Sequence, residues 1–172
     1  MGRNKALLPY QGSTLVQSVA EGVRAVTGTV SLVGKPHRDC LPGYRIVPDI
    51  YPGEGPLGGI LTALQHSLAD WNLIVACDMP EIQIEFLERL MEAAESSGSD
   101  ALVPVGPTGR WEPLCAVYHR NSLPGLYAAF ASGIRKIAVA LREIPMTTWK
   151  VPEELSCFQN VNTPEDWAPY ER

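Results

Sequence analysis

A continuous apolar run that ends at an aspartate constrains the fold of this chain most strongly. Residues 72–77 read Asn-Leu-Ile-Val-Ala-Cys, and Asp78 follows directly. An apolar run of this length, without polar alternation, is typical of a parallel strand that is covered on both faces. Ligands of open α/β sheets bind beyond the carboxyl ends of such strands. Asp78 is therefore the first candidate for a functional residue.

Strand-like and helix-like segments alternate along the rest of the sequence. The apolar spacing predicts helices over residues 14–26, 60–68, 84–94, 123–131 and 134–143, and a last helix that begins at Thr163. Strand-like runs cover residues 29–33, 45–47, 72–77, 101–105, 114–118 and 147–151. This order predicts a single α/β domain over residues 1–172, with a mostly parallel sheet between two layers of helices.

Composition excludes several classes of protein. With 172 residues, of which 45% are hydrophobic, the chain can bury a substantial core. A net charge of -5 without a block of Lys or Arg argues against a nucleic-acid partner. The four cysteines form no C-x-x-C pair, so neither a zinc site nor a disulfide framework is favoured. We find no secretory leader and no run of membrane-helix length, and we expect a cytoplasmic protein without a membrane partner.

The first residues resemble part of a phosphate-binding loop. Gly2 is followed three residues later by Lys5, just before a short apolar run. Backbone N–H groups and one ammonium can then meet the same anion, as they do in Gly-rich loops. A local cationic cluster would consist of Arg3, Lys5, Lys35 and Arg38. For these residues taken alone, a frayed, solvated terminus is the favoured interpretation.

Two aspartates follow strands and are candidate ligands. Asp49 follows the strand at 45–47, and Asp78 follows the most apolar run of the chain. An ionised carboxylate beside such a run needs a partner, a metal or water. Mg²⁺ binds one or two carboxylates together with phosphate oxygens, which suits Asp78. The other interpretation of Asp78 is an ordinary turn residue before Pro80.

Two further segments offer ligand contacts. The loop at 52–59 contains the spacing G-x-G-x-x-G, but Pro52 and Pro56 remove two backbone donors and the preceding strand is too distant for a dinucleotide fingerprint. Its glycines still allow a base or a ribose to approach the backbone, unless the loop is a plain connection. Asn160 and Asn162 lie on one side of an extended segment, where they either bind a heterocycle or form a turn.

The order of these segments resembles the molybdenum cofactor guanylyltransferase family, which belongs to the Rossmann-like nucleotidyltransferases. Members of that family join GMP from GTP to molybdopterin. The resemblance covers almost the whole chain and is carried by residues 1–8, 55–59, 76–80, 112–114 and 158–166. The Asn-Val-Asn-Thr-Pro-Glu-Asp sequence within the last segment is the most specific of these motifs. The resemblance implies a three-layer nucleotidyltransferase fold.

The resemblance also implies roles for individual residues. Lys5 matches the lysine that contacts the nucleotide phosphates, and Asp78 matches the aspartate that holds Mg²⁺. Both are therefore candidate catalytic residues. Asp49 matches an aspartate on the nucleotide side. Gly34 lies near a further nucleotide contact that is Asn in some members.

The second substrate is implied in the same way. Asn160 and Asn162 match residues assigned to the pterin side. The implied reaction is attack by the molybdopterin phosphate on the α-phosphate of GTP, with pyrophosphate leaving. The resemblance also suggests other cofactor-biosynthesis proteins and molybdoenzymes as partners.

The start of the chain departs from the family pattern. Family members carry a strand and a Leu-Ala-Gly-Gly turn before the Met-Gly-x-x-Lys segment, whereas this chain begins at Met1. We therefore expect the native product to start upstream. Two other functions stay open: a related nucleotidyltransferase that uses CTP or a sugar phosphate, and a non-catalytic module that binds a nucleotide or a cofactor.

Overall fold

The computed structural model describes residues 7–35 and 41–155. The strands in these ranges are β1 (Pro9–Tyr10), β2 (Ser13–Thr14), β3 (Ser31–Gly34), β4 (Arg45–Pro48), β5 (Trp71–Val75), β6 (Ala101–Val105), β7 (Cys115–His119) and β8 (Met146–Lys150). The helices are α1 (Leu15–Thr27), α2 (Pro56–His66), α3 (Ile84–Ser96), α4 (Ser122–Ala131) and α5 (Ile137–Ala140), with the 3-10 helices η2 (Leu141–Glu143) and η3 (Glu153–Leu155). The helix predicted from Thr163 lies outside the described residues.

Local sequence signals set both ends of α1. The Thr14 hydroxyl accepts a hydrogen bond from the Gln17 N–H at 3.4 Å, and the Gln17 side chain accepts one from the Thr14 N–H at 3.1 Å. This reciprocal pair is a capping box, which satisfies two N–H groups that have no partner within the helix. Gly28 ends the helix with a φ of 72°, and its N–H donates to the Arg24 carbonyl at 2.8 Å. The predicted helix over residues 14–26 is confirmed.

Helix α2 begins earlier than the sequence predicted. The prediction placed residues 52–59 in a loop, but Pro56 occupies the first helical position. Proline suits that position because its φ is already helical and its missing N–H has no partner there. Gly58 is the third residue of α2, and a Cβ atom at this position would lie 2.9 Å from Cβ of Tyr51. Gly58 therefore allows the preceding loop to pack against the helix.

The four-stranded sheet is mixed in direction. Its order is β5-β7-β6-β8, and a separate parallel pair joins β3 to β4. The prediction of parallel strands holds for β3–β4 and β6–β8, whereas β7 runs antiparallel to both β5 and β6. The reason is the connection: β6 and β7 are joined by a loop, while parallel neighbours need a crossover that is usually a helix. The β1–β2 hairpin was not predicted.

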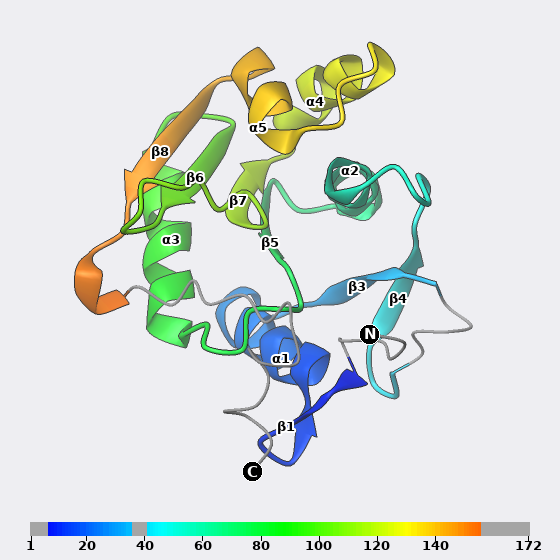
Figure 1. The fold of residues 1–172 in the computed structure, drawn as a ribbon, viewed down its shortest axis with the longest axis vertical. Coiled ribbons are helices and arrows are strands. Elements are labelled where there is room, and N and C mark those ends of the chain that lie inside the picture. The colour runs from blue at the N-terminus through cyan, green and yellow to red at the C-terminus, as the bar shows by residue number, and fades with distance from the viewer. Residues whose placement is uncertain (1–6, 36–40, 156–172) are drawn as a thin grey trace.

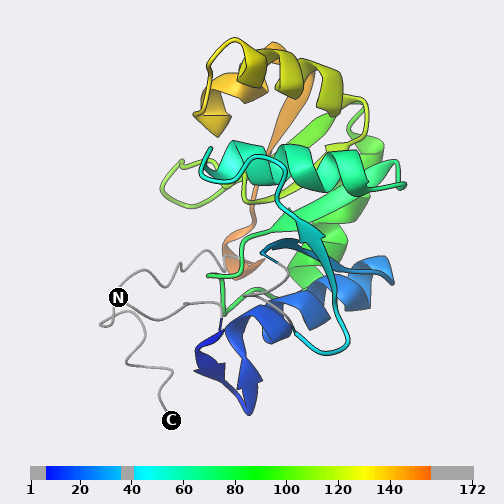
Figure 2. The same cartoon turned by 90° about the vertical axis from the view of Figure 1, so that its right-hand side faces the viewer.

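Helices cover both faces of this sheet (Figures 1 and 2). An apolar core lies on each face. Ala101 and Val103 of β6 face the core formed with α2, α4 and α5. Leu102 lies between them in the strand and faces the core formed with α3 and part of α1. This alternation is the period of two expected for a strand covered on both faces. Among the described residues, no helix combines the length and the apolar character needed to cross a bilayer.

Candidate active site

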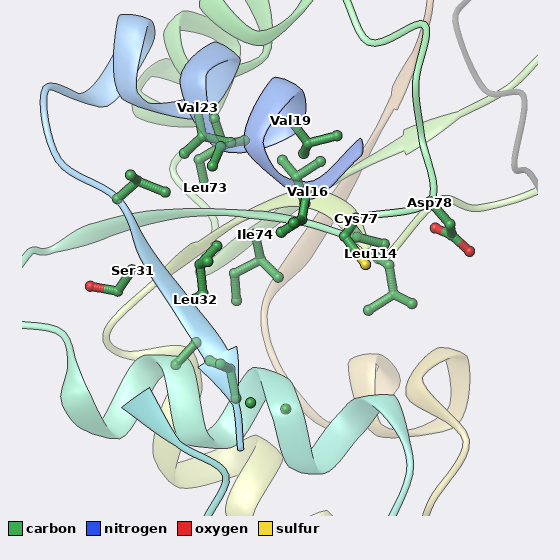
Figure 3. A pocket seen from close by; sticks show the side chains of 18 of the residues that line it. Val16, Val19, Val23, Ser31, Leu32, Leu73, Ile74, Cys77, Asp78 and Leu114 are labelled. Atoms are coloured by element: carbon green, nitrogen blue, oxygen red, sulfur yellow. The ribbon is translucent and has the colours of Figure 1, made fainter. Parts of the chain in front are cut away.

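A cavity of about 560 Å³ lies between β3 and β5, with α1 on one side and α2 on the other (Figure 3). Gly34, the last residue of β3, lines it. Asp78, three residues beyond the end of β5, lines it as well. Two of the predicted nucleotide-side residues therefore face the same space.

Asp78 carries a buried oxygen that lacks a hydrogen-bond partner within the described residues. This atom is Oδ1, and the next residue, Met79, is only 1% exposed. The Tyr10 hydroxyl donates to the carbonyl of Pro80 at 3.0 Å, so the β1–β2 hairpin holds the segment that follows the aspartate. Burying a carboxylate oxygen without a partner is costly. The geometry therefore suits a cation or a donor brought by a ligand.

A second carboxylate, Glu112, lies close to Asp78. Glu112 is 8% exposed, and burial raises the pKa of its carboxyl group. The guanidinium of Arg110, with Nε 3.7 Å from Glu112 Oε1, lowers that pKa, and the charge of Asp78 raises it. Two acidic side chains that interact in a largely buried place suit a hard divalent cation.

Sequence reasoning did not assign a role to Glu112. It precedes an expected strand, and the amino end of a parallel strand lies away from the ligand edge. Because β7 is antiparallel, Cys115 at its start pairs with Val75 at the end of β5. The residues just before β7 therefore lie beside the residues just after β5. The available sequence signal was an acidic residue just before an apolar strand. This signal could point to the site only once the direction of that strand was known.

Asp49 connects three elements beside the cavity. Its Oδ1 accepts hydrogen bonds from the Thr62 hydroxyl at 3.1 Å and from the Tyr51 N–H at 3.0 Å. The Thr62 oxygen also accepts from the Ile50 N–H at 3.1 Å. The Asp49 N–H donates to the carbonyl of Gly34 at 3.2 Å, so these two predicted nucleotide-side residues are neighbours. Asp49 itself does not line the cavity, and its contacts hold the loop before α2 in place.

The remaining predicted site residues, Lys5, Asn160 and Asn162, lie outside the described residues. Lys35, one member of the expected cationic cluster, is exposed directly after β3. Within residues 7–35 and 41–155, no group of three or more His, Cys, Asp or Glu side chains could enclose a metal. The described part of the chain offers the Asp78 and Glu112 carboxylates, and phosphate oxygens of a substrate supply the further ligands that Mg²⁺ commonly takes.

The fold of this chain is also found in a solved cytidylyltransferase. The crystal structure of 2-C-methyl-D-erythritol 4-phosphate cytidylyltransferase from Thermus thermophilus shares the fold with a TM-score of 0.75 at 18% identity, over 97% of this chain and 92% of that one. The MobA-like NTP transferase domain family matches residues 1–144. The chain belongs to this family, and it is an enzyme of the nucleotidyltransferase class.

Relatives and a solved structure agree on a narrower group. The chain is 32% identical over 167 residues to a probable molybdenum cofactor guanylyltransferase of Deinococcus radiodurans, covering 97% of this chain and 85% of the relative. It is 31% identical over 171 residues to a molybdenum cofactor guanylyltransferase of Vibrio cholerae, covering 98% and 83%. The crystal structure of molybdopterin-guanine dinucleotide biosynthesis protein A from Archaeoglobus fulgidus matches with a TM-score of 0.83 at 29% identity, over 99% of this chain and 90% of that one. The resemblance drawn from the sequence is confirmed.

Proposed function

We propose that this chain transfers GMP from GTP to molybdopterin and releases pyrophosphate, with Mg²⁺ held by Asp78. One observation supports the proposal most directly: Asp78 lines the cavity, and its buried Oδ1 has no hydrogen-bond partner in the described part of the chain. The relatives are named for guanylyl transfer to the molybdenum cofactor and the solved structure for molybdopterin-guanine dinucleotide, and these names support GTP and molybdopterin as the substrates. The proposed setting is cytoplasmic, with other cofactor-biosynthesis proteins and molybdoenzymes as further partners.

The protein's own task in this reaction is positioning. Asp78 would hold the cation, and Glu112, whose carboxyl group is affected by the charge of Asp78, would add a second negative charge near it. The bound cation would offset negative charge on the phosphates during in-line displacement. Lys5 would bind the same phosphates, Gly34 would contact the nucleotide, and Asp49, predicted on the nucleotide side, would hold the loop beside it. Holding two substrates aligned in one cleft removes much of the entropy cost of bringing them together from the barrier of the reaction.

Purified protein tests the substrates directly. We expect pyrophosphate release when molybdopterin and Mg²⁺ are supplied with GTP, and little release with ATP or CTP. Turnover with CTP alone would identify a cytidylyltransferase and reject the proposal. Turnover with a sugar phosphate in place of molybdopterin would reject the second substrate. Tight GTP binding without any turnover would assign the chain to a nucleotide-binding module.

The Asp78→Asn variant tests the metal ligand. The amide keeps the size of the side chain but removes the charge, so we expect transfer to fall by at least about 100-fold, which corresponds to roughly 2.7 kcal/mol of transition-state stabilisation. Asp70→Asn is the matched control, because Asp70 is 68% exposed and pairs with Arg120 at 3.3 Å. Full activity of Asp78→Asn would remove this residue from the site.

Asn162→Ala tests the proposed pterin side. We expect weaker binding of molybdopterin with little change in the affinity for GTP, because the lost amide would contact one substrate and not the other. Titration calorimetry with each substrate measures the two affinities separately. Equal losses for both substrates would indicate that Asn162 forms a structural turn.

A further inference from the structure

The loop that precedes α2 adjoins the cavity. It consists of residues 51–55, and Pro56, the residue directly after it, lines the cavity together with Gly59. Gly53 and Gly55 have φ angles of 85° and 79°, in a region that other residues rarely adopt. Glycine also loses more backbone freedom than any other residue when it is ordered. Contacts from other elements therefore decide whether this loop keeps one conformation.

Tyr51 fixes the start of the loop against two helices. Its hydroxyl accepts a hydrogen bond from Nε2 of Gln65 in α2 at 3.0 Å, and the centroid of its ring lies 4.8 Å from that of Phe130 in α4. Helices α2 and α4 pack against each other, so the two contacts hold Tyr51 together (Figure 1). The Tyr51 carbonyl accepts a hydrogen bond from the Glu54 N–H at 3.1 Å. The loop therefore turns between these two residues.

Glu54 links the rest of the loop to the segment after α4. Its Oε2 accepts a hydrogen bond from Nε of Arg135 at 2.5 Å, across 81 positions of the sequence. Glu54 is the one residue between Gly53 and Gly55, and neither glycine has a side chain. The Glu54 carboxylate is therefore the group through which a side-chain contact can restrain this part of the loop.

Arg135 is itself held by the end of α4. Its Nη1 donates to the carbonyls of Phe130 at 2.7 Å and of Ile134 at 3.2 Å. Its guanidinium carbon lies 4.0 Å from the centroid of the Phe130 ring, which also contacts Tyr51. An exposed ion pair usually contributes little, because two mobile side chains must be ordered to form it. Here the guanidinium is already ordered, so Glu54 pairs with it at a smaller loss of freedom.

We propose that Arg135 is a positioning residue, which acts through Glu54 to hold the loop at residues 51–55 in the conformation that receives the base and the ribose of the nucleotide. This inference rests on the proposed function, because it concerns binding of the same nucleotide. A flat base can approach the backbone closely where Gly53 and Gly55 carry no side chain. A loop that is ordered before binding loses less entropy when the nucleotide binds. The Glu54–Arg135 pair should therefore strengthen nucleotide binding and have little effect on the transfer step itself.

Two variants measure this contribution. Glu54→Gln keeps the size of the side chain and removes its charge, and Arg135→Gln removes the guanidinium. By titration calorimetry with GTP and Mg²⁺, we expect each variant to bind GTP about 5-fold more weakly than the parent, at the upper end of what an exposed ion pair contributes. The double variant should bind no more weakly than Arg135→Gln, because both changes remove the same contact. Unchanged affinity in both single variants, or losses that multiply in the double variant, would overturn the proposal.

A control and a rate measurement separate positioning from general damage. Arg89→Gln removes a similarly exposed arginine, which pairs with Glu85 at 2.9 Å on α3, and it should not change the affinity for GTP. Circular dichroism checks the helices, and Glu54→Gln, which leaves α4 untouched, decides the result if Arg135→Gln loses helix. At saturating GTP, Glu54→Gln should transfer GMP within about 2-fold of the parent rate, as expected when only binding is lost. A lower saturated rate with unchanged GTP affinity would overturn the proposal.

Amide hydrogen exchange without nucleotide tests the loop independently of the reaction. The N–H groups of Glu54 and Gly58 donate within the loop and the first turn of α2, both at 3.1 Å. We expect Glu54→Gln to speed exchange of these two amides by about 5-fold and to leave exchange in β6 unchanged. Unchanged exchange in the loop would overturn the proposal. Equal GTP affinity in parent and variant, with faster exchange in the variant, would overturn the positioning role alone, whereas a parent that binds no GTP would overturn the proposed function as well.

Discussion

Two glycines at equivalent helix positions should respond in opposite directions to the same substitution. Gly59 is the fourth residue of α2, and Gly125 is the fourth residue of α4. Both are partly buried. A Cβ atom at Gly59 meets nothing within 4 Å, whereas one at Gly125 would lie 2.4 Å from Cγ2 of Ile144. We therefore expect Gly59→Ala to stabilise the chain and Gly125→Ala to destabilise it.

The magnitudes follow from two separate contributions. Alanine is favoured over glycine inside a helix by about 1 kcal/mol, and this gain applies to both variants. Overpacking a filled site costs about 1–3 kcal/mol, and this loss applies only at Gly125. Gly59→Ala should thus gain up to about 1 kcal/mol, while Gly125→Ala should lie about 1–3 kcal/mol below it. The difference between the variants isolates the contact with Ile144.

Urea unfolding of each variant, at one pH and one protein concentration, measures both free energies. An unchanged slope with urea concentration would show that only stability has changed. A second arm combines Gly125→Ala with Ile144→Ala, which removes the contacted Cγ2 atom. The double variant should lose less than the sum of the two single losses, since the clash is gone. Equal shifts in the two single alanine variants, or strict additivity in the double variant, would refute the packing argument.

Two further predictions concern residues around the site. Burial raises the pKa of Glu112, so this glutamate favours the folded state below its ordinary pKa of about 4.3 and loses that contribution as pH rises through the raised value. Glu112→Gln should therefore be more stable than the parent at pH 7 and lose this advantage at pH 4. Urea unfolding at both pH values measures the difference in the free energy of unfolding. A difference that does not change with pH would contradict the prediction. Thr62→Val leaves the Ile50 N–H and the Asp49 carboxylate without their hydroxyl partner and should lower stability by about 1–3 kcal/mol. Thermal unfolding should show a lower midpoint for this variant and little change for Thr148→Val at an exposed position of β8. An unchanged midpoint in Thr62→Val would show that the hydroxyl is dispensable.

The sequence was sufficient to predict those features that depend on interactions within one helical turn or one strand. Thr14 and Gly28 bracket α1 because a side-chain cap and a left-handed residue act within one helical turn. The strand predicted over residues 101–105 coincides with β6 because its apolar residues face covered surfaces on both sides. The start of α2 was missed because Pro56 and two glycines were interpreted as a loop, although proline favours the first turn of a helix.

Other features depend on contacts between distant segments. The direction of β7 follows from its antiparallel pairing with β5 and β6, and it cannot be predicted from the residues of β7 alone. Asp78 could be predicted from its own strand, but Glu112 became a candidate only when the antiparallel pairing placed it at the same edge. The cavity between β3 and β5 likewise exists only between segments that lie about forty residues apart in the sequence, since β3 ends at Gly34 and β5 begins at Trp71.

The antiparallel course of β7 also determines where a label can be attached. Its last residue, His119, pairs with Trp71 at the start of β5, so the following turn lies at the edge of the sheet opposite Asp78. Arg120 and Asn121 in this turn are exposed. A fluorophore or an affinity tag inserted there would lie away from the cavity that Asp78 lines. The loop between β6 and β7, by contrast, ends at Leu114, which lines that cavity, so a label placed there would disturb it.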